Sequence, residues 1–356
     1  MWRTFPDGKL VRKSLGRYFA IIENKKTAKF LIAKKVAAEF GSDDALETLW
    51  KQHMHSAEES QRIEHQVDMG IDFNAIPLPE KSYLDLKIKI ASKILECCHF
   101  CSRRCKVNRL TDRLGFCGCG KMMAVSSIFM HMGEEPELVP SGTIFTMGCT
   151  MRCRHCQNWT ISQWKEAPPM EYKPEELAKE IENLQIEGCR NMNLVGGEPT
   201  PWLGHWLETF KHVNVNAPVV WNSNSYYSQE TAQLLAGFAD VYLLDFKYGP
   251  GDCAERISDA PNYWDICQRN HLEAKKHGEL LARVLVLPGH LDCCTKPILN
   301  WIAENLGAET RVNVMFQYRP KWRAHEIPEL RRRLTAEEIE KALGLAEQAG
   351  LKNLVT

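Results

Sequence analysis

The chain has 356 residues, of which 44% are hydrophobic and 25% charged, and its 45 basic and 45 acidic side chains give a formal net charge of +0. This balance argues against nucleic acid or an anionic membrane surface as a partner. No apolar run approaches the roughly 20 residues of a membrane span, and the opening residues lack the apolar core of a signal peptide. We therefore expect a cytoplasmic protein with one large domain and an appendage.

Residues 1–95 are predicted to form a helical, polar N-terminal extension. Helical spacing runs over Asp43–His65, with Ser42 or Asp43 as the expected N-cap, and returns over Tyr83–Cys97. Two prolines in FNAIPLPEKS predict a loop or linker between these helices. The extension carries no motif that indicates chemistry.

Residues 96–140 form a predicted Cys-rich metal-binding module. Six of the fourteen cysteines of the chain lie there: Cys97, Cys98, Cys101, Cys105, Cys117 and Cys119. The set Cys98, Cys101, Cys105 and Cys117 has the spacing C-x2-C-x3-C-x11-C, which suits four metal ligands. Six free thiols in one short stretch would be liable to oxidation, which favours bound metal. Structural zinc and an electron-relaying [4Fe-4S] cluster both fit, and the knuckle-like spacing slightly favours zinc.

Residues 141–320 alternate short apolar runs with helical stretches. The predicted strands are Thr143–Met147, Asn191–Val195, Pro218–Asn222, Val241–Asp245, Leu281–Leu287 and Arg311–Met315. The predicted helices between them are Pro174–Glu187, His205–Val213, Ser228–Gly237, Trp264–Gly278 and Thr295–Asn305. This alternation implies a parallel sheet with right-handed crossovers. We predict an α/β fold, an open (β/α)6 partial barrel.

Residues 321–356 are predicted to be a helical tail. Thr335 and Glu338 have the spacing of a capping box that opens a helix over Thr335–Ala349. The last residues, LKNLVT, are a candidate for one further strand.

Cys149, Cys153 and Cys156 follow the first predicted strand of the barrel in the spacing C-x3-C-x2-C. Zinc in a closed site and an electron-transfer cluster each take four protein ligands. Three thiolates in one loop suit a [4Fe-4S] cluster in which one iron stays open to a substrate. The alternatives are half of a zinc site completed elsewhere, or buried thiols.

Polar motifs follow the next strands, at the end of a parallel sheet where ligands bind. Gly196 and Gly197 let the backbone approach a ligand closely, and the carboxylate of Glu198 suits an ammonium group. Asn222 and Ser223, with Asn224, follow the third strand. The alternatives are a glycine-rich turn for the first motif and a helix-capping turn for the second.

Asp245 and Lys247 follow the fourth strand, and alternation along a strand places both on one face. An ordinary ion pair is the alternative to a catalytic role. Arg283 lies in RVLVLPG on the fifth strand, and Met315 and Gln317 lie in MFQYRP at the sixth.

Together, GCTMRCRHCQNW, GGEP, DFKY, RVLVLPG and MFQYRP resemble the radical S-adenosylmethionine (SAM) enzymes, and among them the group similar to pyruvate formate-lyase activating enzymes. The resemblance runs from Cys98 to Pro320. It implies that the cysteines of the C-x3-C-x2-C loop ligate a [4Fe-4S] cluster whose open iron binds SAM. An electron from the cluster then cleaves SAM into methionine and a 5'-deoxyadenosyl radical, which abstracts hydrogen from a substrate.

The same resemblance implies roles for single residues. Asp245 and Lys247 would be catalytic. The residues implied in binding SAM are Gly196, Gly197, Glu198, Asn222, Ser223, Asp245, Lys247 and Arg283. His155 stands where the family usually has an aromatic residue near the adenine, and its ring could serve similarly.

We therefore expect a radical SAM oxidoreductase that takes its electron from a reducing partner such as ferredoxin or flavodoxin. The resemblance favours a protein substrate, a glycine Cα–H in a glycyl radical enzyme. The alternatives are another peptide or a small molecule as substrate, or a metal-knuckle binding protein with a catalytically silent barrel.

Overall fold

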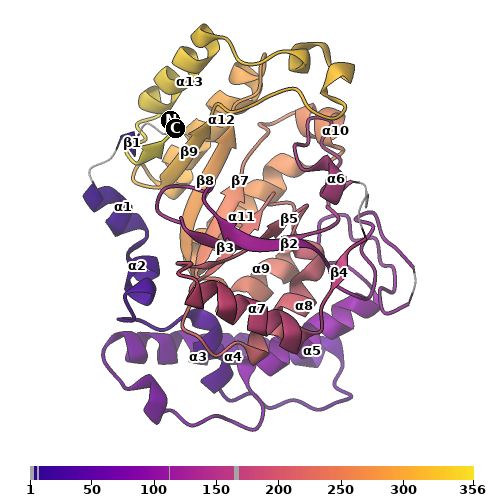
Figure 1. Ribbon diagram of the computed structural model, residues 1–356, viewed down its shortest axis with the longest axis vertical. Coiled ribbons are helices and arrows are strands. Elements are labelled where there is room, and N and C mark those ends of the chain that lie inside the picture. The colour runs from indigo at the N-terminus through magenta and orange to yellow at the C-terminus, as the bar shows by residue number, and fades with distance from the viewer. Residues whose placement is uncertain (1–3, 6–7, 112, 164–167) are drawn as a thin grey trace.

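The computed structural model describes residues 4–5, 8–111, 113–163 and 168–356 (Figure 1). Its centre is a set of six parallel strands. Their order across the sheet is the same as their order along the chain. The strands are β3 (Ser141–Thr146), β5 (Met192–Gly196), β6 (Val219–Ser223), β7 (Val241–Asp245), β8 (Glu279–Leu285) and β9 (Arg311–Met315). The expected α/β class and partial barrel are confirmed.

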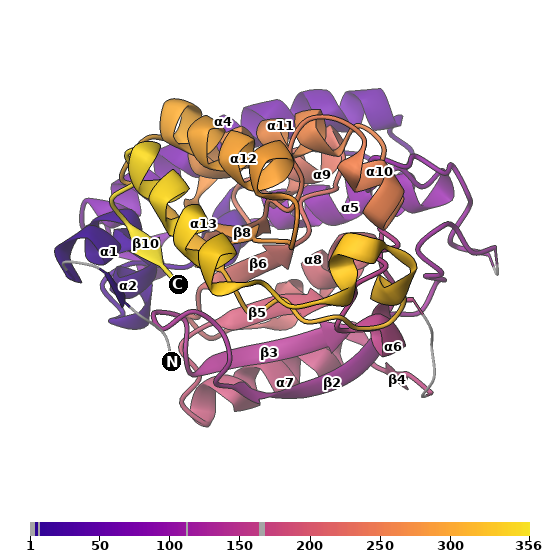
Figure 2. The ribbon, with the colours of Figure 1, turned by 90° about the horizontal axis from the view of Figure 1, so that it is seen from above.

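Helices connect these strands and pack beside the sheet (Figure 2). They are α7 (Pro174–Ile186), α8 (Leu203–His212), α9 (Gln229–Leu235), α11 (Tyr263–His277) and α12 (Lys296–Trp301), with the short helices α6 (Trp159–Ser162) and α10 (Cys253–Ser258) in loops. Each long connecting helix buries an apolar face, such as Leu177, Ile181 and Leu184 of α7. The helices also give each connection the length that it needs to bring the chain back to the start of the next parallel strand.

Over the residues that the structure describes, the sheet is mixed and has ten strands, because antiparallel strands extend it at both edges. β2 (Ala124–His131) pairs antiparallel with β3, and the two-residue β4 (Met170–Glu171) pairs with β2. At the other edge β10 (Leu354–Val355) runs parallel to β9, as expected for LKNLVT, and β1 (Thr4–Phe5) pairs antiparallel with β10. The sequence analysis missed β2 because this strand shows no clean alternation, with both Phe129 and Met130 exposed.

The N-terminal region is helical, as expected. It comprises α1 (Gly8–Ser14), α2 (Gly16–Ile22), α3 (Lys29–Lys35), α4 (Leu46–Asp68) and α5 (Tyr83–Glu96). In Figure 1, α3, α4 and α5 lie together at the lower end of the molecule, where α5 packs on α8. The expected cap at Ser42 or Asp43 is wrong, because the N-cap of α4 is Ala45 and the preceding turn is closed by Asp44, which accepts from the Gly41 amide at 2.8 Å.

The turn between α1 and α2 closes the amino end of the barrel. Leu15 and Tyr18 are buried with the inward-facing Val220, Val241 and Leu281 in a small core of their own. The hydroxyl of Tyr18 also donates to the backbone of the β2–β3 connection, at the carbonyl of Glu137, at 3.1 Å. The N-terminal region therefore plugs the base of the barrel.

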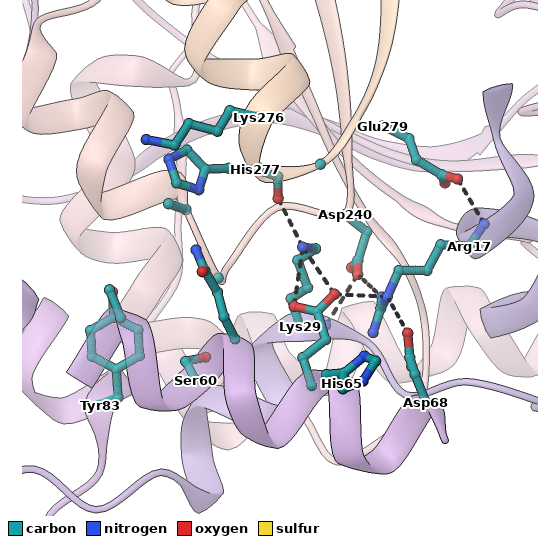
Figure 3. A pocket seen from close by; sticks show the side chains of 16 residues that line it. Arg17, Lys29, Ser60, His65, Asp68, Tyr83, Asp240, Lys276, His277 and Glu279 are labelled. Atoms are coloured by element: carbon teal, nitrogen blue, oxygen red, sulfur yellow. Dashed lines mark hydrogen bonds and ion pairs between the residues drawn. The ribbon is translucent and has the colours of Figure 1, made fainter. Parts of the chain in front are cut away.

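A pocket of about 480 Å³ lies beside this plug, between α4 and the amino ends of β7 and β8 (Figure 3). Arg17 is paired with three carboxylates there, 3.0 Å from Asp240, 2.9 Å from Glu64 and 3.5 Å from Asp68. Lys29 bonds Glu64 at 3.2 Å. Since α/β barrels place their chemistry at the opposite end of the strands, we assign this pocket a structural role.

Across the ranges that the structure describes, we find no helix with both the length and the apolar character needed to cross a membrane.

Candidate active site

A second pocket, of about 290 Å³, lies at the carboxyl ends of the parallel strands. All residues of the predicted cysteine loop and SAM site line it: Cys149, Cys153, Cys156, Gly196, Gly197, Glu198, Asn222, Ser223, Asp245, Lys247 and Arg283. His155, Asn224, Met315 and Gln317 line it as well. Residues that are up to 168 positions apart in the chain are thus brought to one cavity because each follows, or ends, a strand of one sheet.

The cysteine loop is held by backbone contacts with the end of α10. The amide of Arg152 donates to the carbonyl of Ser258 at 2.8 Å, and the amide of Arg154 donates to the carbonyl of Ile257 at 3.0 Å. Carbonyls at the carboxyl end of a helix have no partner within the helix, so they are free to accept from the loop amides. These main-chain bonds hold the cysteine loop against α10.

Of the cysteines of the loop, Cys149 is buried and Cys153 and Cys156 are half-buried. Burial raises the pKa of Cys149, Cys153 and Cys156, that of Cys153 to about 11. Asn224 donates from its side-chain amide to the sulfur of Cys149 at 3.5 Å. Because metal ligands must be deprotonated, binding of a metal or cluster to this loop would release protons.

The two glycines of GGEP are required by contact between loops. A Cβ at Gly197 would overlap the carbonyl oxygen of Gly148, in the cysteine loop. Gly196 has φ = +136°, and a Cβ there would overlap the backbone of Thr146. The absence of a side chain lets the GGEP loop lie directly against the cysteine loop, so both loops line the same cavity.

Glu198 is fully buried and its carboxylate accepts four hydrogen bonds. Oε1 accepts from the Thr200 amide at 3.2 Å, the Thr200 hydroxyl at 2.5 Å and the Ser223 hydroxyl at 2.7 Å. Among the described residues, the one donor to Oε2 is the Asn224 amide, at 2.8 Å. Burial raises the pKa of Glu198 despite these donors. A carboxylate offers about four lone-pair positions, two on each oxygen, so Oε2 keeps room for one further donor.

Asp245 and Lys247 form an ion pair at the wall of the pocket. Their side chains retain 18% and 13% of their exposure, so both can reach a ligand in the cavity. Burial opposes the charge on Lys247, but Asp245 and Cys153 favour it and the pKa of Lys247 is raised. The lysine is therefore a fixed cation close to the cysteine loop.

Arg283 lines the same pocket, but its guanidinium is already engaged. Nε donates to Glu135 at 2.6 Å, Nη1 to Asn222 at 3.1 Å, and Nη2 to both Glu135 and Glu134. Burial would raise the pKa of Glu134, but Arg283 outweighs it and the pKa falls to about 2. The sequence analysis missed these two glutamates. The acidic segment GEEPE stands out in the sequence, but nothing in the sequence indicates that Arg283 is its partner.

His155 contacts two tyrosines, Tyr248 and Tyr318. Its Nε2 is 2.9 Å from the hydroxyl of Tyr248, and its ring meets Tyr318 edge to face. Burial, followed by the charge of Lys247, lowers the pKa of His155 to about 4. The ring is thus neutral near pH 7 and held against the pocket.

The Cys-rich module packs against the cysteine loop. Cys119 donates from its thiol to the carbonyl of Met147 at 3.5 Å, and Arg103 donates to the carbonyl of Thr150 at 2.8 Å. Burial, with the neighbouring thiols of the predicted quartet, raises the pKa of Cys101 to about 12. A hydrogen bond from Cys119 and the charge of Arg109 lower that of Cys117 to about 6. The four cysteines Cys98, Cys101, Cys105 and Cys117 are therefore neighbours.

The sulfurs of this quartet are more widely spaced than the ligands of one zinc ion. Among the described residues, they do not form a group whose ligand atoms all lie within 4.8 Å of one another. In an iron–sulfur cluster each thiolate binds a different iron, so such a cluster tolerates wider spacing than a single tetrahedral ion.

Comparisons with known proteins agree with this geometry. Residues 143–302 match the family described as the Radical SAM superfamily. The uncharacterized protein MJ0674 of Methanocaldococcus jannaschii is 47% identical over 343 residues, 95% of this chain and 98% of its own. The uncharacterized protein MJ0808 of the same organism is 26% identical over 279 residues, 72% of this chain and 79% of its own.

The crystal structure of Streptococcus suis SuiB bound to precursor peptide SuiA overlaps 58% of this chain and 46% of the SuiB chain. The TM-score is 0.40 and the identity 13%. The family match lies on the barrel strands that carry the pocket, and it implies a [4Fe-4S] cluster and SAM. Residues 143–302 of the chain form a radical SAM superfamily domain.

Proposed function

We propose that Cys149, Cys153 and Cys156 hold the [4Fe-4S] cluster and that Glu198, Asp245 and Lys247 bind SAM beside it. The observation that carries this proposal is that these six residues line one cavity at the carboxyl ends of the strands. The donor set fits the group: three thiols come from one loop, and a carboxylate and an ammonium face them. When bound, the cluster supplies the electron that cleaves SAM into methionine and a 5'-deoxyadenosyl radical.

The residues of the chain orient the substrate of this cleavage. Oε2 of Glu198 has room for one donor, which suits the ammonium group of SAM. Lys247 offers a fixed positive charge to a carboxylate or hydroxyl. The neutral ring of His155 suits a stacking contact with the adenine.

The test is formation of 5'-deoxyadenosine by anaerobically reconstituted protein with dithionite and SAM. Replacing all three loop cysteines by alanine should abolish it and remove the iron and sulfide of one cluster. The control is Cys189→Ala, a buried cysteine at the end of α7, remote from the pocket. Undiminished 5'-deoxyadenosine in the triple variant would overturn the assignment.

For the substrate, we propose a glycine Cα–H of a protein, on the resemblance of DFKY and RVLVLPG to the activating enzymes. The proposed location is the cytoplasm, with a ferredoxin or flavodoxin as reductant. A candidate glycyl radical enzyme should stimulate SAM cleavage and acquire a protein-based radical signal in electron paramagnetic resonance. Stimulation by peptides or small molecules without that signal would favour the alternative substrates.

We also propose a second metal centre at Cys98, Cys101, Cys105 and Cys117. The lowered pKa of Cys117 and the mutual interaction of the four thiols support metal binding. The sulfurs do not all lie within 4.8 Å of one another, and this spacing suits the several irons of a cluster better than one zinc ion. Iron and sulfide that remain in the triple alanine variant, and that disappear when Cys117 is also replaced, would support this centre. A triple variant free of iron would exclude a cluster there.

A further inference from the structure

Four potential metal ligands meet outside both cysteine motifs. They are Cys253, the first residue of α10, and His290, Cys293 and Cys294 from the loop and π-helical turn that follow β8. Their ligand atoms all lie within 4.8 Å of one another, and they form the one such group among the described residues. Neither the sequence motifs nor the proposed SAM site uses any of them.

Four of the six distances within the group match the edges of a tetrahedron around one ion, and all six are within 4.8 Å. The Cys253 sulfur lies 3.9 Å from the Cys293 sulfur, which lies 3.8 Å from that of Cys294. His290 Nδ1 lies 3.6 Å from the Cys253 sulfur and 3.4 Å from the Cys293 sulfur. Bonds of about 2.3 Å from zinc to sulfur and about 2.0 Å to nitrogen give tetrahedral edges of about 3.8 Å and 3.5 Å.

The surroundings of His290 suit a metal ligand. Its Nε2 lies 3.5 Å from Oε1 of Glu329, and that same oxygen accepts from Arg256 at 3.0 Å. A carboxylate close to Nε2 favours the proton on that nitrogen and leaves the lone pair of Nδ1 for a metal, and a carboxylate on the far nitrogen is the usual arrangement behind a metal-bound histidine. His290, Cys253 and Cys294 are buried, whereas Cys293 is exposed and provides a route for the ion.

We propose that Cys253, His290, Cys293 and Cys294 bind one zinc ion in a closed, structural Cys3His site. Four protein ligands leave no open position for a reacting molecule. An iron–sulfur cluster does not fit, because thiolates that bind different irons cannot lie as close as those that share one ion. The sulfurs are also too far apart for a disulfide, whose bond is about 2.05 Å.

The position of this site gives it a mechanical role. Zinc would tie the start of α10 to the segment after β8, while the end of α10 bonds the amides of Arg152 and Arg154 in the cysteine loop. Gly249 adds to this contact, since a Cβ there would overlap the carbonyl oxygen of Cys293. The zinc site would therefore brace the loop proposed to hold the radical SAM cluster.

Metal analysis of the full-length protein tests the site independently of the proposed function. Protein purified under reducing conditions without added metal should lose about one zinc per chain in Cys293→Ala and in His290→Ala. Cys189→Ala should keep the zinc of the parent. Iron measured in the same samples reports the cluster cysteines separately. Equal zinc in the parent and in Cys293→Ala, or a Cys253–Cys293 disulfide in peptide maps of the parent, would overturn the proposal.

A titration with Co²⁺ provides a second test, which reports the metal ligands directly even if a variant folds poorly. Metal-free parent titrated with Co²⁺ should show tetrahedral ligand-field bands and thiolate-to-cobalt charge transfer, and Cys293→Ala should show weaker charge transfer because one thiolate is missing. Amide exchange at Arg152 and Arg154 should rise in Cys293→Ala and stay at the parental rate in Cys189→Ala. Identical cobalt spectra in the parent and Cys293→Ala contradict the site.

Discussion

Lys247 is the residue whose electrostatic surroundings bear most directly on the proposed binding of SAM. It forms a partly exposed ion pair with Asp245, and its charge is favoured by Cys153. A lysine held in this way can serve a ligand without a change of protonation state. A purely structural ion pair would instead be worth less than about 1 kcal/mol.

We expect Lys247→Ala to weaken SAM binding by roughly 10- to 150-fold, since charge-assisted hydrogen bonds contribute about 1.5–3 kcal/mol. Binding can be measured by anaerobic titration of the reconstituted protein, whose cluster spectrum should not change. Lys93→Ala, which removes a surface partner of Glu96, is the matched control. Parental SAM affinity in Lys247→Ala would show that the Asp245–Lys247 pair is structural.

His271 gives the folded protein a dependence on pH that is separate from the pocket. It is buried in α11, where Nδ1 contacts the carbonyl of Cys267 at 2.8 Å, and burial lowers its pKa to about 4. Between pH 6.5 and about 4 the unfolded chain binds a proton that the folded chain does not, so stability falls as the pH falls. The slope is about 1.4 kcal/mol per pH unit, or about 3 kcal/mol over this window.

Urea denaturation of the parent and of His271→Phe across pH 4–6.5 checks this expectation. Phenylalanine keeps an aromatic ring against Phe246. The difference in unfolding free energy between parent and variant should change with pH by the amount stated above. A constant difference would mean that His271 titrates alike in the folded and unfolded chains. His55→Phe, on the exposed side of α4, serves as the control.

The sequence could locate the pocket residues because each lies next to a predicted strand. Cys149, Glu198 and Lys247 are separated along the chain, but a parallel sheet brings the carboxyl ends of its strands to one edge. It could not locate the partners of Arg283, because Glu135 is 148 positions away in a connection with no regular pattern. Cys253 and His290 escaped notice for the same reason, since 37 positions separate them.

At the scale of elements, α2 and α4 are joined to the barrel by buried charge. Arg17 of α2 contacts Asp240, which has 1% of its side chain exposed, and Glu64 of α4. Asp240 also accepts from the amide of Val219, so it links two strands to the helices. The ion pair therefore joins three parts of the chain rather than two.

Arg17→Met should lower the unfolding free energy by about 3–5 kcal/mol, because it leaves the carboxylate of Asp240 buried without its cation. Arg12→Met is the matched control. The ion pair of Arg12 with Glu23 is exposed, and its loss should change the unfolding free energy far less than the loss of Arg17 does. Both values can be read from urea denaturation. Equal effects of the two substitutions would mean that the Arg17 network is screened like a surface pair.

Local signals decided which elements could be predicted. The capping box of Thr335 and Glu338 was predicted correctly, because α13 (Ala336–Gln348) begins with both of its reciprocal hydrogen bonds. The start of α4 was wrong because Asp44, one residue beyond the candidate caps, is used by a turn instead. β2 was missed because burial falls along the strand instead of alternating, so the sequence shows no period of two.

At the scale of the whole molecule, Tyr18 connects the N-terminal region to two distant parts of the barrel. It is buried in the plug, donates to the carbonyl of Glu137 and accepts from Asn191 at 2.9 Å. Sequence analysis predicted a helical extension without a role for it. The sequence could not predict the plug, because nothing in the apolar strand residues indicates which distant segment of the chain packs on them.

Tyr18→Ala should therefore destabilise the whole protein by about 3–5 kcal/mol, the usual range for removing a large buried aromatic ring. Tyr18→Phe keeps the packing and loses only the hydroxyl, so it should cost about 1–3 kcal/mol. Thermal or urea unfolding followed by circular dichroism measures both. If Tyr18→Ala melts only α1 and α2 in a separate early transition, the plug is an independent unit and not part of the cooperative core.

The pairing of β1 with β10 has a consequence for the order of the chain. Thr4 faces Val355 and Phe5 faces Leu354, so these paired residues have Cα atoms about 5 Å apart. A short linker could join them, and new ends could be opened in the exposed loop around Leu78. Such a circular permutant should keep the fold, and in it the plug would be synthesised after the strands that it closes.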